Sequence, residues 1–199
     1  PEVMTGRCLL NVYHYCNITS LENDPMEMRM QIEDAGLKVA CLSAHSNLMD
    51  TEYGVDYLKK AVRFAYILGS PFVNTAEGPK PEWMTDDDAF RVMGYNLATL
   101  TKMAENYGIT ITIEPHGIYT TNADGLLRIM SLSDSKNLAI NFDTGNVTIA
   151  GNDALETLKK VIGHVVLQPR VDQTRGHRPL GAHPCCEHFG LSLGADSAA

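Results

Sequence analysis

The chain has 199 residues, of which 44% are hydrophobic and 20% charged, and its formal net charge is -8. This length and composition predict one folded domain with a substantial core, and the acidic balance argues against a nucleic-acid partner, which normally requires a basic surface. No apolar run is long enough to cross a membrane and no leader pattern is visible, so we expect no membrane association. The five scattered cysteines favour core thiols over a disulfide framework, which predicts a cytoplasmic location.

Predicted helices and strands alternate along most of the chain. Asp24 and Pro25 predict the start of a helix that ends at Gly36. Short apolar runs typical of strands follow at 38–43, 71–75, 109–113 and 138–142, and each one ends in a turn. Between and after them, helical periodicity predicts helices over 56–65, 86–107, 122–130 and 153–162.

This repeat of strand and helix predicts a parallel sheet covered by helices. A doubly wound sheet and a (β/α)8 barrel both satisfy the pattern, and periodicity alone does not choose between them. Another strand begins at His164. Residues 167–199, however, show neither helical periodicity nor the alternation of a strand, and they are rich in proline, glycine and small residues. We therefore expect an irregular tail there.

Two carboxylates are the first candidates for chemistry. Glu114 directly follows the β-branched run 109–113, and Asp143 directly follows the apolar run 138–142. Such runs are typical of parallel strands buried on both faces, where an ionised carboxylate needs a partner. Because ligands bind at the carboxyl ends of parallel strands, both acids are expected at a site. Carboxylates joined by an imidazole would suit Mg²⁺, Mn²⁺, Co²⁺ or Zn²⁺.

Each of these two acids also has a purely structural explanation. Glu114 is followed by the turn Pro115-His116-Gly117 and could serve as a helix cap or an ion-pair partner. Asp143 could form an Asx-turn with Gly145.

The other candidates are open to the same two interpretations. His45 and His116 lie at strand ends, where either one could be a structural histidine. Glu77 could be a substrate contact or a surface carboxylate, and Asn146 could cap the segment after Asp143. Trp83 could cover a bound sugar or anchor its loop.

Four motifs, in this order, resemble the sugar phosphate isomerase/epimerase family of xylose isomerase-like TIM barrels: Ser43-Ala44-His45, Asn74-Thr75-Ala76-Glu77-Gly78, Ile113-Glu114-Pro115-His116-Gly117 and Phe142-Asp143-Thr144-Gly145-Asn146. The resemblance runs from about Val3, at the end of the second barrel strand, to Val166, at the start of the seventh. It implies an α/β fold, an incomplete (β/α)8 TIM barrel with strands 2 to about 7. Residues 1–166 would form this domain and 167–199 the tail.

The resemblance implies a metal-dependent isomerase or epimerase of a small sugar or sugar derivative. Family members bind a divalent metal, commonly Mn²⁺, Mg²⁺ or Co²⁺, with two glutamates, an aspartate and a histidine. Glu114 matches the first glutamate, which is both ligand and catalytic residue, and Asp143 matches the aspartate. One glutamate removes the proton beside the carbonyl, and the other returns it through an enediolate.

The resemblance assigns the sugar pocket to four further residues: His45, Glu77, His116 and Asn146. It also exposes a departure from the family. The place of the seventh-strand histidine reads Val165-Val166-Leu167-Gln168, His164 comes too early for that role, and the eighth-strand glutamate has no counterpart. With half of the metal shell missing, we expect weak metal binding and little turnover from this chain alone.

Three alternatives follow from the same residues. The chain could be a non-catalytic fragment of such a barrel, a metal-dependent lyase or dehydratase, or an endonuclease of the same superfamily. The endonuclease is disfavoured by the acidic charge and by the small number of strand-end histidines. The strand edges of an incomplete barrel would also favour a homo-oligomer.

Overall fold

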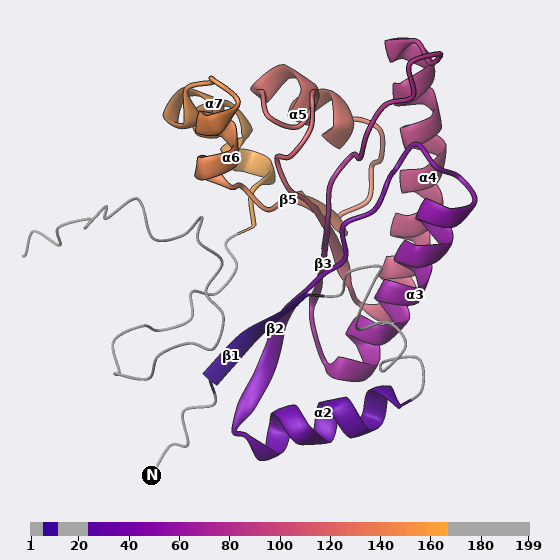
Figure 1. Ribbon diagram of the computed structural model, residues 1–199, viewed down its shortest axis with the longest axis vertical. Helices are drawn as coiled ribbons and strands as arrows, with labels where there is room; N and C mark the ends of the chain where they lie inside the picture. The colour runs from indigo at the N-terminus through magenta and orange to yellow at the C-terminus, as the bar shows by residue number, and fades with distance from the viewer. Residues whose placement is uncertain (1–5, 12–23, 167–199) are drawn as a thin grey trace, which may run out of the picture.

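The computed structural model describes residues 6–11 and 24–166 (Figure 1). In this part of the chain, five parallel strands form one sheet in the order β1-β2-β3-β4-β5. Their bounds are β1 (Gly6–Asn11), β2 (Leu37–Ser43), β3 (Phe72–Thr75), β4 (Thr110–Ile113) and β5 (Leu138–Ile140). The predicted tail over 167–199 and the first part of the predicted second barrel strand, 3–5, lie outside the described residues.

Helix α2 (Pro25–Asp34) precedes β2, and a helix follows each described strand from β2 onward. These helices are α3 (Tyr53–Leu68) after β2, α4 (Asp86–Tyr107) after β3, α5 (Ala123–Met130) after β4, and α6 (Thr144–Ile149) and α7 (Ala154–Val161) after β5. In Figure 1, α2, α3 and α4 cover one side of the sheet, and α3 packs between the other two. The strand order never reverses, as it would in a doubly wound sheet. The described residues therefore form an open part of a (β/α)8 barrel, which confirms the predicted fold. None of these helices combines the length and the hydrophobicity that a membrane span requires.

Four of the predicted helix ends are confirmed by their caps, whereas α3 begins at Tyr53 rather than at residue 56. The Asp24 carboxylate accepts a hydrogen bond from the Glu27 amide at the start of α2, and Asn122 caps α5 in the same way. Gly69 and Gly108 end α3 and α4 with φ values of +71° and +66°, which favour glycine.

The chain differs from the prediction after β5. This strand stops at Ile140 rather than at residue 142, and the unpredicted helix α6 begins at Thr144. Farther along, Val165 pairs in parallel with Ile140, and the Val166 amide donates to the Ile140 carbonyl at 3.0 Å. The expected next strand therefore begins beside β5.

The alternation of side chains along β4 separates the core from the site. Ile111 and Ile113 are fully buried in the hydrophobic core that the strands share with the helices. Thr112 and Glu114 are in the opposite phase, and Thr112 lies in register with Asn74 of β3. Because successive side chains in a strand point to opposite faces, these polar groups lie on the face turned away from the helices, inside the barrel.

Candidate metal and sugar site

Glu114 lies at the carboxyl end of β4, where its amide still donates to the Thr75 carbonyl at 2.8 Å. Its side chain is only 15% exposed. One carboxylate oxygen, Oε1, is 3.0 Å from His116 Nε2, and the other, Oε2, is 3.4 Å from His45 Nε2. The two predicted histidines thus meet the first predicted carboxylate.

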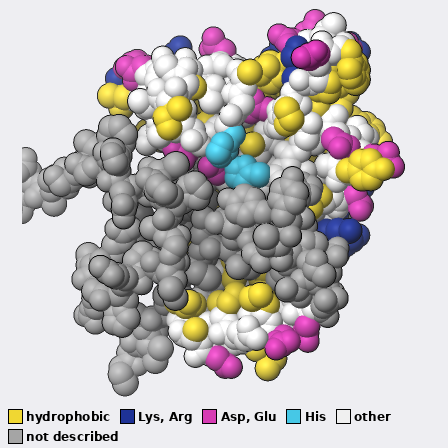
Figure 2. All heavy atoms as spheres, viewed as in Figure 1, with side chains coloured by type: hydrophobic (Ala, Val, Ile, Leu, Met, Phe, Trp, Pro, Cys, Tyr) yellow, Lys and Arg dark blue, Asp and Glu magenta, His cyan; other side chains and the backbone are white. Residues whose placement is uncertain are grey.

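His45, Glu114 and His116 form what we call the strand-end cluster. Each offers one ligand atom, and these atoms all lie within 4.8 Å of one another. The two imidazole rings meet edge to face, with centroids 4.7 Å apart. Figure 2 shows histidine side chains gathered beside acidic ones on the face in view. The cluster is therefore open to a small ligand on one side.

Two amides hold the Glu114 carboxylate from beneath. Asn74 Nδ2 donates a hydrogen bond to Oε2, and Asn141 Nδ2 lies 3.4 Å from the same oxygen. Asn74 is oriented in turn by Thr112, whose hydroxyl donates to Asn74 Oδ1 at 2.9 Å. Sequence reasoning missed both asparagines. The strand register that places Asn74 opposite Thr112, two residues before Glu114, is a property of the folded sheet and leaves no signal in the sequence.

The pKa values of the cluster favour an ion pair. Burial alone would raise the pKa of Glu114, but hydrogen bonds from His116 and His45, the charge of His45 and the amide of Asn74 together hold it far below its usual range. The hydrogen bond to Glu114 raises the pKa of His116 in spite of partial burial, and the charge of Asp143 adds to this effect. At neutral pH the carboxylate is therefore ionised.

Asp143 and Asn146 lie at the edge of the cluster. Asp143 Oδ1 accepts a hydrogen bond from the Asn146 amide at 3.0 Å and caps α6. The Asn146 side-chain nitrogen is 3.3 Å from His116 Nε2. Asp143 thus has a structural role as a helix cap, made with Asn146 instead of the Asx-turn with Gly145 that was considered, and its role as a metal ligand stays a prediction.

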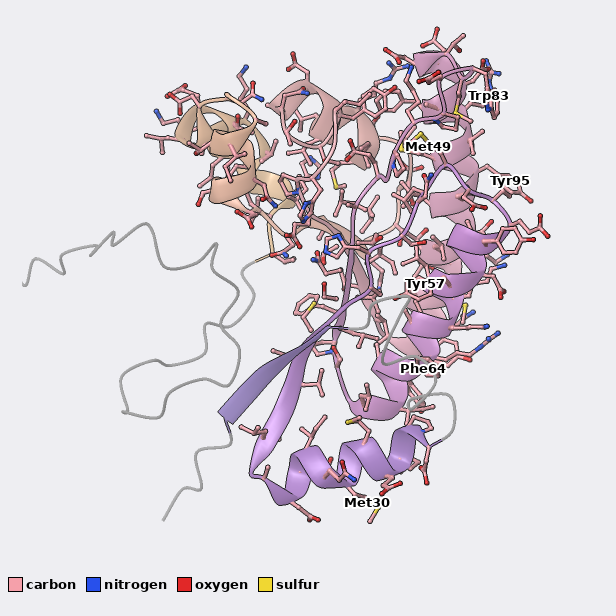
Figure 3. The ribbon with its side chains drawn as sticks, in the orientation of Figure 1. Met30, Met49, Tyr57, Phe64, Trp83 and Tyr95 are labelled. Carbon is pink, nitrogen blue, oxygen red and sulfur yellow. The ribbon has the colours of Figure 1, made fainter. Side chains whose placement is uncertain are left out.

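Glu77 is fully buried, unlike the other predicted sugar contacts. Its carboxylate accepts hydrogen bonds from the Tyr119 amide at 2.8 Å, the Thr120 amide at 3.3 Å and the Thr120 hydroxyl. These donors turn Glu77 toward the loop after β4, so it presents no exposed oxygen to a sugar. Trp83 is 80% exposed beside the start of α4, so it packs neither over the cluster nor into the core (Figure 3).

The donor set of the strand-end cluster fits a divalent cation. Two imidazoles and one carboxylate are ligands that suit Zn²⁺, Mn²⁺ or Co²⁺, whereas Mg²⁺ prefers oxygen ligands alone. A ring nitrogen can coordinate only when it carries no proton, so a bound cation would compete with protons for His45 and His116.

Known proteins with similar sequences cover part of this chain. A protein of Methanocaldococcus jannaschii described as uncharacterized protein MJ1311 is 34% identical over 107 residues, which are 50% of this chain and 36% of that protein. An inosose dehydratase of Clostridium perfringens is 25% identical over 85 residues, which are 42% of this chain and 29% of the dehydratase. The chain thus matches about a third of the length of these relatives.

Solved structures share the fold over most of the chain. The xylose isomerase domain protein of Planctomyces limnophilus superposes with a TM-score of 0.68 at 21% identity, over 81% of this chain and 63% of that one. A D-tagatose 3-epimerase-like protein gives 0.63 at 24% identity, over 80% and 62% of the two chains. The IolI protein with a bound zinc atom gives 0.65 at 16% identity, over 80% and 60%.

The sequence profile of one family covers most of the chain. It is described as the xylose isomerase-like TIM barrel and matches residues 12–190. This match extends past residue 166, so the predicted division between domain and tail stays a prediction. The open parallel sheet and the shared fold of the solved structures agree with the profile, and the chain belongs to the family of xylose isomerase-like TIM barrels.

Proposed function

We propose that the strand-end cluster binds a divalent cation and is the active site of a metal-dependent isomerase or epimerase that acts on a small sugar or sugar derivative. The observation that supports this most strongly is an ionised, mostly buried carboxylate held between two imidazoles at the end of a parallel strand. Family membership and epimerases among the similar structures support the same reaction class. The scattered cysteines support a cytoplasmic location.

His45, Glu114 and His116 are the residues that would hold the cation, with Asp143 as a candidate fourth ligand. A bound divalent cation would polarise the sugar carbonyl and acidify the neighbouring C–H bond. The two imidazoles favour Mn²⁺, Co²⁺ or Zn²⁺ over Mg²⁺. The zinc atom in the IolI structure supports a cation in a barrel of this fold.

Glu114 is the proposed proton acceptor. Its pKa is held low, so it is ionised throughout the neutral range, and the Asn74 and Asn141 amides fix the direction of Oε2. His116 is 45% exposed and lies within hydrogen-bonding distance of Glu114. As a cation ligand it would have no proton to donate at that nitrogen, so the protonated Glu114 would return to the substrate the proton that it removed. Asn146, beside His116, is placed to bind a sugar hydroxyl.

A dehydratase is the second candidate, and the similarity to an inosose dehydratase favours it. Dehydration begins with the same proton abstraction beside a carbonyl and then needs an acid that protonates the departing hydroxyl group, which leaves as water. Glu114, protonated by the first step, would be that acid. The inosose dehydratase relative and a similar structure described as a probable 3-DHS dehydratase belong to this reaction class.

Proton abstraction can be tested without knowledge of the final product. The full chain is incubated with Co²⁺ or Mn²⁺ and a panel of ketoses and inososes in D₂O, and NMR follows deuterium incorporation at the carbon beside the carbonyl. We expect incorporation by the wild type and its loss in Glu114→Gln. Glu82→Gln makes the same change at an exposed carboxylate outside the site and should retain the activity.

The products then separate the two candidates. A recovered sugar with altered stereochemistry or carbonyl position indicates an isomerase or epimerase, and a product that has lost water indicates a dehydratase. Cation binding without deuterium incorporation for any substrate would contradict both and favour a non-catalytic fragment.

A further inference from the structure

A buried carboxylate outside the strand-end cluster remains without a chemical role. Glu77 is fully buried, and three donors surround its carboxylate: the Tyr119 amide, the Thr120 amide and the Thr120 hydroxyl. Desolvation of a carboxylate is costly unless hydrogen bonds replace the lost water. The chain therefore keeps this carboxylate at a specific position and with a specific set of donors.

The Thr120 hydroxyl connects Glu77 to the cluster. While it donates to Glu77, it accepts hydrogen bonds from the His116 amide at 2.9 Å and the Gly117 amide at 3.1 Å. Gly117 lies so close to the Glu77 carboxylate that a Cβ would collide with Oε1. The backbone that carries the His116 imidazole is thus fastened to Glu77 through one hydroxyl group.

Glu77 also fixes the loop that carries the other imidazole. Its backbone carbonyl accepts a hydrogen bond from the Leu48 amide at 3.0 Å, shortly after His45 in the chain. The next residue, Gly78, has a φ of +79°, and a Cβ there would come within 2.6 Å of Asn47 Cα. The loops after β2, β3 and β4 therefore meet at Glu77, and two of them carry the histidines of the cluster.

We infer that Glu77 and Thr120 are positioning residues that hold His45 and His116 at the distance from Glu114 that a cation requires. This inference rests on the proposed function for the cation, but it replaces the sugar-contact role predicted for Glu77. Residues that orient metal ligands usually change metal affinity or activity by about 10–100-fold when they are mutated. The same range is expected here.

The test uses Thr120→Val, which removes the hydroxyl and retains the shape of the side chain. Thr101→Val is the matched control. Thr101 is also a buried threonine, at 2% exposure, and its hydroxyl donates to the Leu97 carbonyl at 2.8 Å within α4, with no bond to the cluster. Thr120→Ser restores the hydroxyl.

Co²⁺ alone is titrated into the full chain and followed by its visible absorption. We expect Thr120→Val to weaken Co²⁺ binding by about tenfold or more, with Thr120→Ser and Thr101→Val within about threefold of the wild type. A folded Thr120→Val that binds Co²⁺ within about twofold of the wild type would overturn the inference, and so would an equal loss in Thr101→Val. If Thr120→Val does not fold, Thr120→Ala against Thr101→Ala gives the same comparison.

A second readout separates this inference from the proposed function. In the metal-free protein, long-range ¹H–¹⁵N NMR reports the imidazole resonances of His45 and His116. We expect them to move in Thr120→Val and to stay in place in Thr101→Val. If the wild type bound no cation but these resonances moved, the proposed function would fail and the positioning role would stand. Resonances that stay in place in Thr120→Val would overturn the positioning role.

Discussion

Replacing Asn74 by aspartate changes only one side-chain group, but it replaces a hydrogen-bond donor to Glu114 by a negatively charged oxygen. The Asn74 nitrogen, which donates to Glu114 Oε2, becomes an oxygen that repels it. Asn74 is 2% exposed and the Glu114 side chain 15% exposed, so water screens the new repulsion weakly. One of the two carboxyl groups must then take up a proton in the folded state.

The magnitude follows from the contacts that are lost. A hydrogen bond to a charged group contributes about 1.5–3 kcal/mol, and keeping one carboxyl group protonated at pH 7, against an unfolded pKa of about 4, costs up to about 4 kcal/mol. We expect Asn74→Asp to lower the free energy of unfolding by about 3–5 kcal/mol at pH 7 in the metal-free protein. The loss should shrink on acidification, because the shared carboxyl pair has a raised pKa in the folded state and gains its proton as the pH falls.

Urea unfolding followed by circular dichroism, at about pH 7 and about pH 5, measures both effects. Adding Glu114→Gln to Asn74→Asp supplies a side-chain amide that can donate to the new carboxylate, so the double variant should recover part of the lost stability. A loss below about 1 kcal/mol at pH 7, or a double variant less stable than Asn74→Asp alone, would refute the proposed contact between Asn74 and Glu114.

Three further predictions follow from the same structure. In the metal-free wild type, the low pKa of Glu114 contributes stability that is present above its unfolded pKa of about 4.3 and is lost as the pH falls below that value. Urea titrations at a series of pH values should show this loss of stability in the wild type and a smaller loss in Glu114→Gln. Asp143→Asn keeps a good helix cap, so the free energy of unfolding should change by less than about 0.5 kcal/mol. Its Co²⁺ affinity should fall tenfold or more if Asp143 is a ligand and should stay unchanged if Asp143 serves only as the cap. Leu97→Ala creates a cavity at a fully buried core position of α4 and should cost about 2–5 kcal/mol in thermal or urea unfolding, with Co²⁺ affinity retained in the folded fraction.

The fold could be predicted because its signals are local. The apolar run before Glu114, the acids in the first turn of α4 and the glycines that end α3 and α4 each determine the backbone within a few residues. The consecutive order of the strands is not a local property, and only the resemblance to a barrel family suggested it. The helix α6 was missed because six residues are too few to show a periodic pattern.

The candidate site was predicted only where strand ends mark it. Glu114 directly follows β4, and His45 and His116 come two and three residues after the ends of β2 and β4, so parallel pairing brings the three together. The roles of Asn74 and Thr120 depend on contacts with Glu114 and Glu77, respectively, which lie far from them in the sequence. No spacing of residues in the sequence indicates these contacts. Glu77 carries the same strand-end signal as Glu114, but its side chain turns toward the loop after β4.

The central claim is that the three residues of the strand-end cluster bind one cation, and crystallography tests it most directly. Crystals of the full chain are soaked with Co²⁺, and diffraction is measured on both sides of the cobalt absorption edge. We predict an anomalous peak within about 2.0–2.2 Å of a ligand atom of each of His45, Glu114 and His116. A chain that is saturated with Co²⁺ in solution but has its anomalous peak elsewhere, or a peak that persists in Glu114→Gln crystals with no contact to either imidazole, would contradict the assignment.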